Sequence, residues 1–154
     1  VEAQRWGGLD LILESTASVR ARLSVNDPSS AFAAACALPA ASRVLFVGEP
    51  RGFGFPRDFA APSQHDVSPL RELLERNLSP EDAAKELSRR GFTHLLINWG
   101  ELGRLDHGYP VAPWRDADGL ARWRRFLYWL GPPTIASGPV EVFDLGGRGA
   151  SRRP

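Results

Sequence analysis

Two short apolar runs, residues 42–48 and 92–99, constrain the fold of this 154-residue chain more than any other feature. Each run is nearly continuous rather than alternating, which is typical of strands buried on both faces in a parallel sheet. Between them lie two helix start signals, at Ser68 and Ser79, each followed by a proline. A strand, two helices and a second strand form a βαβ-type unit, so we expect parallel strands and a right-handed crossover.

The flanking segments predict further helices and a terminal hairpin. Residues 31–38 favour a helix that ends at a proline, and Asp116 is a predicted N-cap for a helix with apolar residues on one face. Residues 134–136 and 140–145 flank a Ser-Gly-Pro turn and predict a closing hairpin. We therefore predict an α/β fold: a Rossmann-like three-layer arrangement with a small, mostly parallel sheet and a C-terminal hairpin.

The composition, 43% hydrophobic and 24% charged, is sufficient for a buried core. We expect residues 1–145 to form a single soluble α/β domain, with residues 1–40 as its helical N-terminal part and residues 146–154 as a disordered tail. The chain starts at Val1 and contains no methionine, from which we expect a processed chain or a fragment of a larger protein. The longest apolar candidate, residues 31–41, is about half of the ~20 residues that a transmembrane helix needs.

Charge and motif content argue against several classes of protein. A net charge of +1 gives no basic surface for nucleic acid, so no nucleic-acid partner is predicted. The glycines at 48, 52 and 54 do not form a dinucleotide-binding pattern, and the three histidines have no metal-ligand spacing, so we predict no cofactor and no metal. The single cysteine, Cys36, excludes an internal disulfide and is expected to be a small buried thiol.

Two segments that follow the predicted strands, residues 49–57 and 100–113, are predicted to be long loops. Both leave from the carboxyl ends of the strands, where ligands bind in open α/β sheets. If the strands are neighbours, the side chains of the two segments face one crevice. The candidate binding residues are Glu49, Arg51, Arg57, Asn98, Trp99 and Glu101, and the second segment also brings Arg104, Asp106, His107 and Tyr109.

Such a crevice would suit a sugar or a phosphosugar. Carboxylates and asparagine bond hydroxyl groups, tryptophan stacks on apolar ring faces, and arginine binds phosphate bidentately. The alternative is structural: Glu49 and Arg51 pair with each other to hold the loop, and Trp99 is the last core residue of its strand. None of these residues is predicted to be catalytic, because no nucleophile elbow, Walker loop or zinc pattern is present.

Several short motifs follow one another in a distinctive order over most of residues 40–145. They are Gly48-Glu49 with Arg51 and Phe53 just after, Arg90-Gly91, the run Thr93-His94-Leu95-Leu96-Ile97-Asn98-Trp99, Glu101-Leu102, and the hairpin segment 140–145. This order resembles the C-terminal extracytoplasmic region of bacterial polytopic glycosyltransferases that are similar to the dolichyl-phosphate-mannose–protein mannosyltransferases (glycosyltransferase family 39 and its relatives). Phe143 stands where a tyrosine is usual in that family.

The resemblance implies a location and a role rather than an active site. In that family, transfer depends on acidic residues in loops between membrane helices and uses a polyprenyl-phosphate sugar donor; no position here matches those residues, so none is carried over. The resemblance implies a non-catalytic accessory domain of such a transferase at the extracytoplasmic (periplasmic) face of the bacterial cytoplasmic membrane, tethered by helices missing from this chain.

The expected partners are the transmembrane part of the same polypeptide and a polyprenyl-phosphate sugar or a glycan acceptor. Two other classes of function stay open from the residues alone. The first is a stand-alone sugar-phosphate-binding protein or small α/β enzyme that uses the crevice. The second is a protein–protein interaction module with no small ligand.

Overall fold

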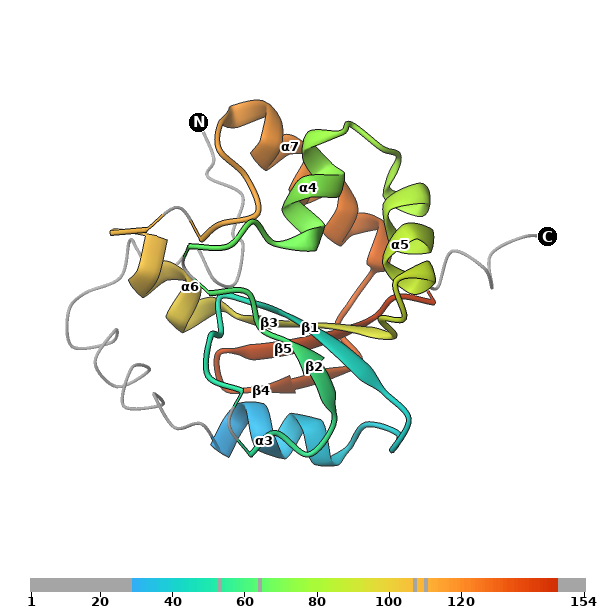
Figure 1. Cartoon of the computed structure of the whole chain (residues 1–154), viewed down its shortest axis with the longest axis vertical. Helices are drawn as coiled ribbons and strands as arrows, with labels where there is room; N and C mark the ends of the chain where they lie inside the picture. The colour runs from blue at the N-terminus through green and yellow to red at the C-terminus, as the bar shows by residue number, and fades with distance from the viewer. Residues whose placement is uncertain (1–28, 53, 64, 107, 110, 147–154) are drawn as a thin grey trace.

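A mixed sheet lies at the centre of the computed structural model, which describes residues 29–52, 54–63, 65–106, 108–109 and 111–146. Within these residues the sheet has five strands in the order β2-β1-β3-β5-β4 (Figure 1). The strands are β1 (Arg43–Val47), β2 (Asp58–Ala60), β3 (His94–Asn98), β4 (Ile135–Ser137) and β5 (Val140–Asp144). The predicted parallel pairing of β1 with β3 is confirmed. The helical segment expected before residue 29 and the tail after residue 146 lie outside the described residues.

Helices cover both faces of this sheet. They are α3 (Ser29–Cys36), α4 (Pro69–Glu75), α5 (Pro80–Arg89), α6 (Trp99–Asp106) and α7 (Ala117–Leu130). In Figure 1, α4, α5 and α7 lie on one side of the sheet and α3 lies on the other. Within the described residues, no helix combines the length and the apolar character that crossing a bilayer requires.

The two central strands are buried on both faces, as their apolar sequences predicted. Leu45, Val47, Leu95 and Ile97 pack in one core cluster with α4, α5 and α7. The intervening residues Val44, Phe46 and Leu96 pack in a second cluster with α3. Because side chains alternate between the faces of a strand, each apolar run contributes to both cores.

Capping residues start and end the helices where the sequence predicted. The Ser79 hydroxyl accepts a hydrogen bond from the Asp82 backbone N–H at 3.1 Å, and the Asp116 carboxylate accepts one from the Gly119 N–H at 2.7 Å. These bonds satisfy amide groups that have no partner within the first helical turn. Gly91, which follows the C-cap residue Arg90 of α5, has a φ of 89°, a conformation that favours glycine.

The structure differs from the sequence-based expectations at three places. The sheet is only half parallel: β1 pairs in parallel with β2 and β3, whereas β3–β5 and β5–β4 are antiparallel. Residues 100–113 are not one long loop, because α6 begins directly after β3. Cys36 is exposed rather than buried, since it lies at the end of α3 on the side away from the core.

Candidate functional site

The carboxyl ends of β1 and β3 meet in a buried hydrogen-bond network centred on Glu49, which is 4% exposed. The Nε and Nη2 atoms of Arg51 donate to the two carboxylate oxygens of Glu49 at 2.8 and 2.9 Å. The Asn98 side-chain amide donates to Glu49 Oε2 at 2.7 Å. Glu49 is therefore held from both strands, and its burial is compensated by a charged partner and a neutral donor.

The same network fixes the start of α6. Asn98 Oδ1 accepts a hydrogen bond from the Glu101 backbone N–H at 3.1 Å, which caps the helix. The Glu101 carboxylate is 3% exposed on its side chain and binds Arg104 at 2.9 and 2.5 Å. The hydrogen bonds from Arg104 hold the pKa of Glu101 below its ordinary value. The hydrogen bond to Glu49 likewise raises the pKa of Arg51.

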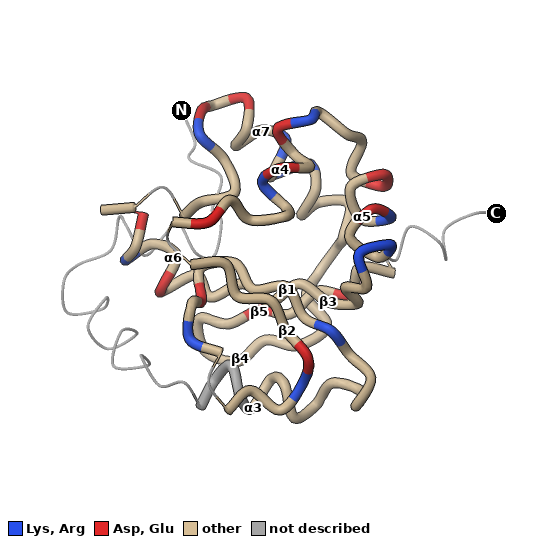
Figure 2. The backbone as a smooth tube through the Cα atoms, in the orientation of Figure 1, with Lys and Arg blue, Asp and Glu red and all other residues tan. Residues whose placement is uncertain are grey.

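Four of the predicted crevice residues, Glu49, Arg51, Asn98 and Glu101, are thus brought together as expected. Charges of both signs are visible where α6 begins and along α4 and α5 (Figure 2). The buried carboxylates bind neighbouring residues of their own strand end or helix, so this cluster matches the structural alternative. Its evident role is to join the sheet to α6.

Trp99 is also engaged within the protein. Its indole Nε1 donates to Glu141 Oε2 at 2.7 Å, and its ring centroid lies 6.3 Å from that of Trp123 in an edge-to-face contact. The side chain packs against the core formed with α7. The Trp99 ring therefore serves as a core contact at the end of β3, as the alternative reading predicted.

Arg57 lies at the opposite end of the sheet from the crevice. The next residue, Asp58, pairs in register with Arg43 at the start of β1. The Arg57 guanidinium donates to the backbone oxygens of Leu38 at 2.6 and 3.0 Å and of Pro39 at 2.9 Å, just beyond α3. Because β2 runs parallel to β1, the chain must return to the amino end of the sheet before β2 starts. The structure therefore does not bring Arg57 to the other candidates.

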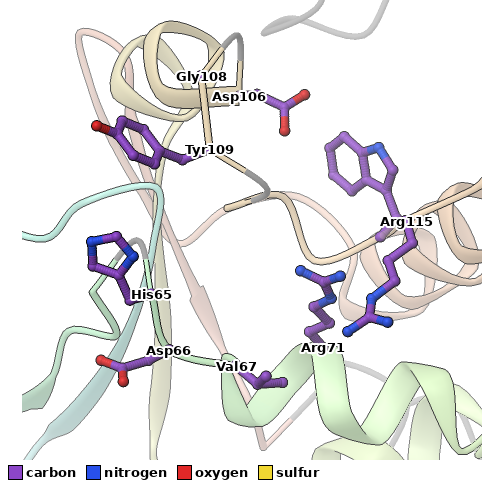
Figure 3. Close-up of a pocket in the computed structure, with 9 residues that line it drawn as sticks. His65, Asp66, Val67, Arg71, Asp106, Gly108, Tyr109 and Arg115 are labelled. Carbon is purple, nitrogen blue, oxygen red and sulfur yellow. The ribbon is translucent and has the colours of Figure 1, made fainter.

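An open hollow of about 740 Å³ lies beyond this network, between the start of α4 and the segment that joins α6 to α7 (Figure 3). Its lining residues are His65, Asp66, Val67, Arg71, Asp106, Gly108, Tyr109, Trp114 and Arg115. Those from 65 to 67 follow the carboxyl end of β2, and those from 106 to 109 follow β3 through α6. The hollow, called the α4–α6 pocket below, thus occupies the edge where open α/β sheets bind ligands.

Two arginines on one wall of the pocket share a carboxylate. The Nε atoms of Arg71 and Arg115 lie 3.0 and 2.9 Å from the same oxygen of Glu75, Oε1. Asp106 and Tyr109 project from the end of α6 and the residues after it, on the other side of the hollow (Figure 3). The pocket therefore has a cationic wall opposite a wall with carboxylate and phenol groups.

An aromatic contact in the pocket lining joins His65 and Tyr109. Their ring centroids lie 6.1 Å apart with the planes nearly perpendicular. Asp66 follows directly and places a second carboxylate on the lining. Hydrogen bonds from Ser63 keep the pKa of Asp66 below its ordinary value, so this carboxylate is ionised at neutral pH.

None of the six candidate binding residues predicted from the sequence lines this pocket. Asp106 and Tyr109 were among the residues expected after the second strand, whereas His107 lies outside the described residues. Arg71 and Arg115 belong to α4 and to the segment before α7, and no local sequence signal connects them. In the described part of the chain, no group of three or more His, Cys, Asp or Glu side chains could hold a metal ion.

The fold and site define an α/β domain with a mixed sheet and a ligand-sized pocket, lined by charged and aromatic residues, in the segments that follow the carboxyl ends of its parallel strands. Comparison with protein-family models, with curated proteins and with solved structures found no match to this chain.

Proposed function

We propose that this chain is a non-catalytic, sugar-binding accessory domain of a membrane glycosyltransferase that uses a polyprenyl-phosphate sugar donor. The observation that carries the proposal is the α4–α6 pocket, which combines carboxylates, arginines and aromatic rings at one edge of the sheet. Its volume of about 740 Å³ falls within the range of small-molecule sites, roughly 300–1,000 Å³.

The pocket chemistry favours a hydroxylated ligand. The ionised Asp66 and the carboxylate of Asp106 can accept hydrogen bonds from hydroxyl groups, as carboxylates in sugar sites do. Tyr109 and Trp114 offer ring faces to the apolar side of a sugar, and Tyr109 is 42% exposed. Such a set can bind and orient a sugar, because aromatic faces and hydrogen-bonding groups line the same cavity.

The resemblance of residues 40–145 to the extracytoplasmic region of family 39 glycosyltransferases supports the wider context. On this basis we place the domain at the periplasmic face of the cytoplasmic membrane, where it would position the donor or the acceptor for a catalytic site in the membrane part of the same polypeptide. We further propose that α3, the sheet and the α4–α5–α7 layer are a reduced Rossmann-like arrangement. Binding at the carboxyl ends of parallel strands is the usual mode of such folds.

A titration followed by NMR tests the sugar site. We expect neutral hexoses and hexose 1-phosphates to shift the amide signals of pocket residues, and Tyr109→Ala to weaken binding about fivefold, as loss of an aromatic contact of about 1 kcal/mol would. Tyr128→Ala is the matched control, because Tyr128 is 88% exposed on α7 and does not line the pocket. If no sugar shifts the pocket signals, the proposed function is wrong.

The membrane context has its own test in the full-length protein. The gene should encode several apolar segments of ~20 residues outside this domain. In membranes containing that protein, Tyr109→Ala should lower sugar transfer while Tyr128→Ala leaves it unchanged. Equal transfer by the two variants, or a gene without such segments, would contradict the accessory role.

A further inference from the structure

We propose that Arg71, Glu75 and Arg115 form a phosphate-binding site, so that the ligand of the α4–α6 pocket is a phosphate ester of a sugar rather than a neutral glycan. This inference rests on the proposed function and names its ligand class. Soluble sugar phosphates and lipid-linked sugar phosphates share this phosphate group, and the competition experiment below distinguishes the two kinds of ligand.

The geometry around Glu75 prepares two guanidinium groups for one anion. The Nε atoms of both arginines lie within ion-pair distance of Glu75 Oε1, so the two groups converge on one point. The three side chains by themselves carry a formal charge of +1. The Arg115 side chain is 62% exposed and lines the pocket, so an anion in the pocket can reach its guanidinium group. Arginine pairs of this kind suit the several oxygens of a phosphate, because each planar guanidinium can donate two parallel hydrogen bonds.

The burial of the two arginines differs in a way that fits a partly enclosed anion. The side chain of Arg71 is 8% exposed, whereas that of Arg115 is 62% exposed. One cation therefore lies at the base of the wall and the other at its rim. An anion between them would lose part of its water, and charge-assisted hydrogen bonds are stronger where water is partly excluded.

A third arginine adds positive charge behind this wall. Arg122 lies with Trp114 and Arg115 in an adjoining hollow of about 180 Å³. Its Nε is buried and has no hydrogen-bond partner in the described residues. Glu75 and Asp116 are the carboxylates in the lining of that hollow, and Asp116 accepts the capping hydrogen bond of α7.

The distribution of charge also sets the orientation of the ligand. Three arginines face Glu75 and Asp116 on the α4–α7 side, whereas Asp66 and Asp106 line the remainder of the pocket. A phosphate is attracted to the first side and repelled from the second. The carboxylates can accept hydrogen bonds from sugar hydroxyls, so a ligand with one anionic end and one hydroxylated end matches both sides.

Calorimetric titration of the whole chain with inorganic phosphate, a hexose 1-phosphate and the free hexose tests this site. We expect the phosphate ester to bind at least about tenfold more tightly than the hexose, the effect of one charge-assisted hydrogen bond. Arg115→Gln should remove that difference. Arg76→Gln is the matched control: Arg76 is 55% exposed and pairs with a glutamate of α4, Glu72, but does not line the pocket.

The outcomes separate this inference from the function on which it rests. If the hexose binds as tightly as its phosphate and Arg115→Gln changes neither, the phosphate site is refuted while the sugar site stands. If inorganic phosphate binds through Arg115 and the sugar adds nothing, the phosphate site stands and the proposed function fails. A short-chain prenyl phosphate in micelles that competes with the hexose 1-phosphate supports the site with a lipid-linked ligand; absence of competition supports a soluble one.

Discussion

Replacing Asn98 with alanine would test whether the buried network at the carboxyl ends of β1 and β3 holds α6 on the sheet. The substitution removes the 2.7 Å hydrogen bond to the buried Glu49 carboxylate, and a bond to a charged group contributes about 1.5–3 kcal/mol. It also removes the side chain that accepts from the Glu101 N–H, and loss of an N-cap costs about 1 kcal/mol. We therefore expect the free energy of unfolding to fall by about 3 kcal/mol.

Urea unfolding, followed by tryptophan fluorescence and far-UV circular dichroism, would measure this loss. Asn98→Asp separates the two contributions, because it keeps an oxygen to cap α6 but places a second carboxylate against Glu49. At pH 7 it should be at least as destabilising as Asn98→Ala. Ser88→Ala, at an exposed position of α5, should change the free energy of unfolding by less than about 0.5 kcal/mol.

Two results would refute this reasoning. A loss below about 1 kcal/mol for Asn98→Ala would mean that the Glu49 contact and the cap contribute little in solution. Stability of Asn98→Asp equal to that of the unsubstituted chain would mean that Asn98 acts through helix capping alone.

Two further predictions concern α6. Gly48 has a φ of 71°, and a Cβ there would lie 2.5 Å from Leu102 Cβ; Gly48→Ala should therefore lower the free energy of unfolding by about 2 kcal/mol or more. At Gly103 a Cβ would meet nothing within 4 Å, so Gly103→Ala should instead raise the free energy of unfolding by up to about 1 kcal/mol. If urea unfolding shows Gly48→Ala to be more stable than Gly103→Ala, the described packing of Gly48 against α6 is wrong. Arg104 lowers the pKa of Glu101 in the folded state, so at acidic pH the unfolded state binds more protons at Glu101 than the folded state does. The stability that the Glu101–Arg104 ion pair contributes is therefore lost as pH falls below 4.5. The melting temperature of Glu101→Gln should therefore lie furthest below that of the parent chain near pH 7. If this difference in melting temperature does not become smaller toward pH 3, the ion pair does not stabilise the fold.

The parts of the fold that depend on local sequence could be predicted. The strands 43–47 and 94–98 are mostly apolar, and a short, nearly continuous apolar run is the main sequence signal of a buried parallel strand. The caps at Ser79 and Asp116 also act within one helical turn, so their effect is contained in a few neighbouring residues.

The parts that depend on distant contacts could not be predicted in the same way. Strand β2 is only three residues long and is defined by its pairing with β1. Helix α6 contains Gly100 and Gly103, which disfavour helix, and its cap is an asparagine oriented by Glu49 from another strand. Four of the six candidates, Glu49, Arg51, Asn98 and Glu101, therefore meet at the carboxyl ends of β1 and β3 and bind within one network, whereas Trp99 binds Glu141 and Arg57 lies at the other end of the sheet.

The cationic wall of the pocket was missed for a related reason. Arg71 and Arg115 belong to different elements and meet through Glu75, which only the packing of α4 beside the segment before α7 brings about. Each arginine by itself has the sequence context of an ordinary solvated residue. Ion pairs between segments that are distant in the chain leave no periodic pattern or fixed spacing in a single sequence.

The direct passage from β3 into α6 has a mechanical consequence for the pocket. With no loop between them, the eight-residue helix behaves as a stiff arm about 12 Å long that is anchored at Asn98. Asp106 is at its C-terminal end and forms part of the pocket lining. A tilt of about 10° at the anchor would displace that end by about 2 Å, enough to break a hydrogen bond. The Asp106 side of the pocket therefore depends on the anchor at the opposite end of α6, although Asn98 itself does not line the pocket.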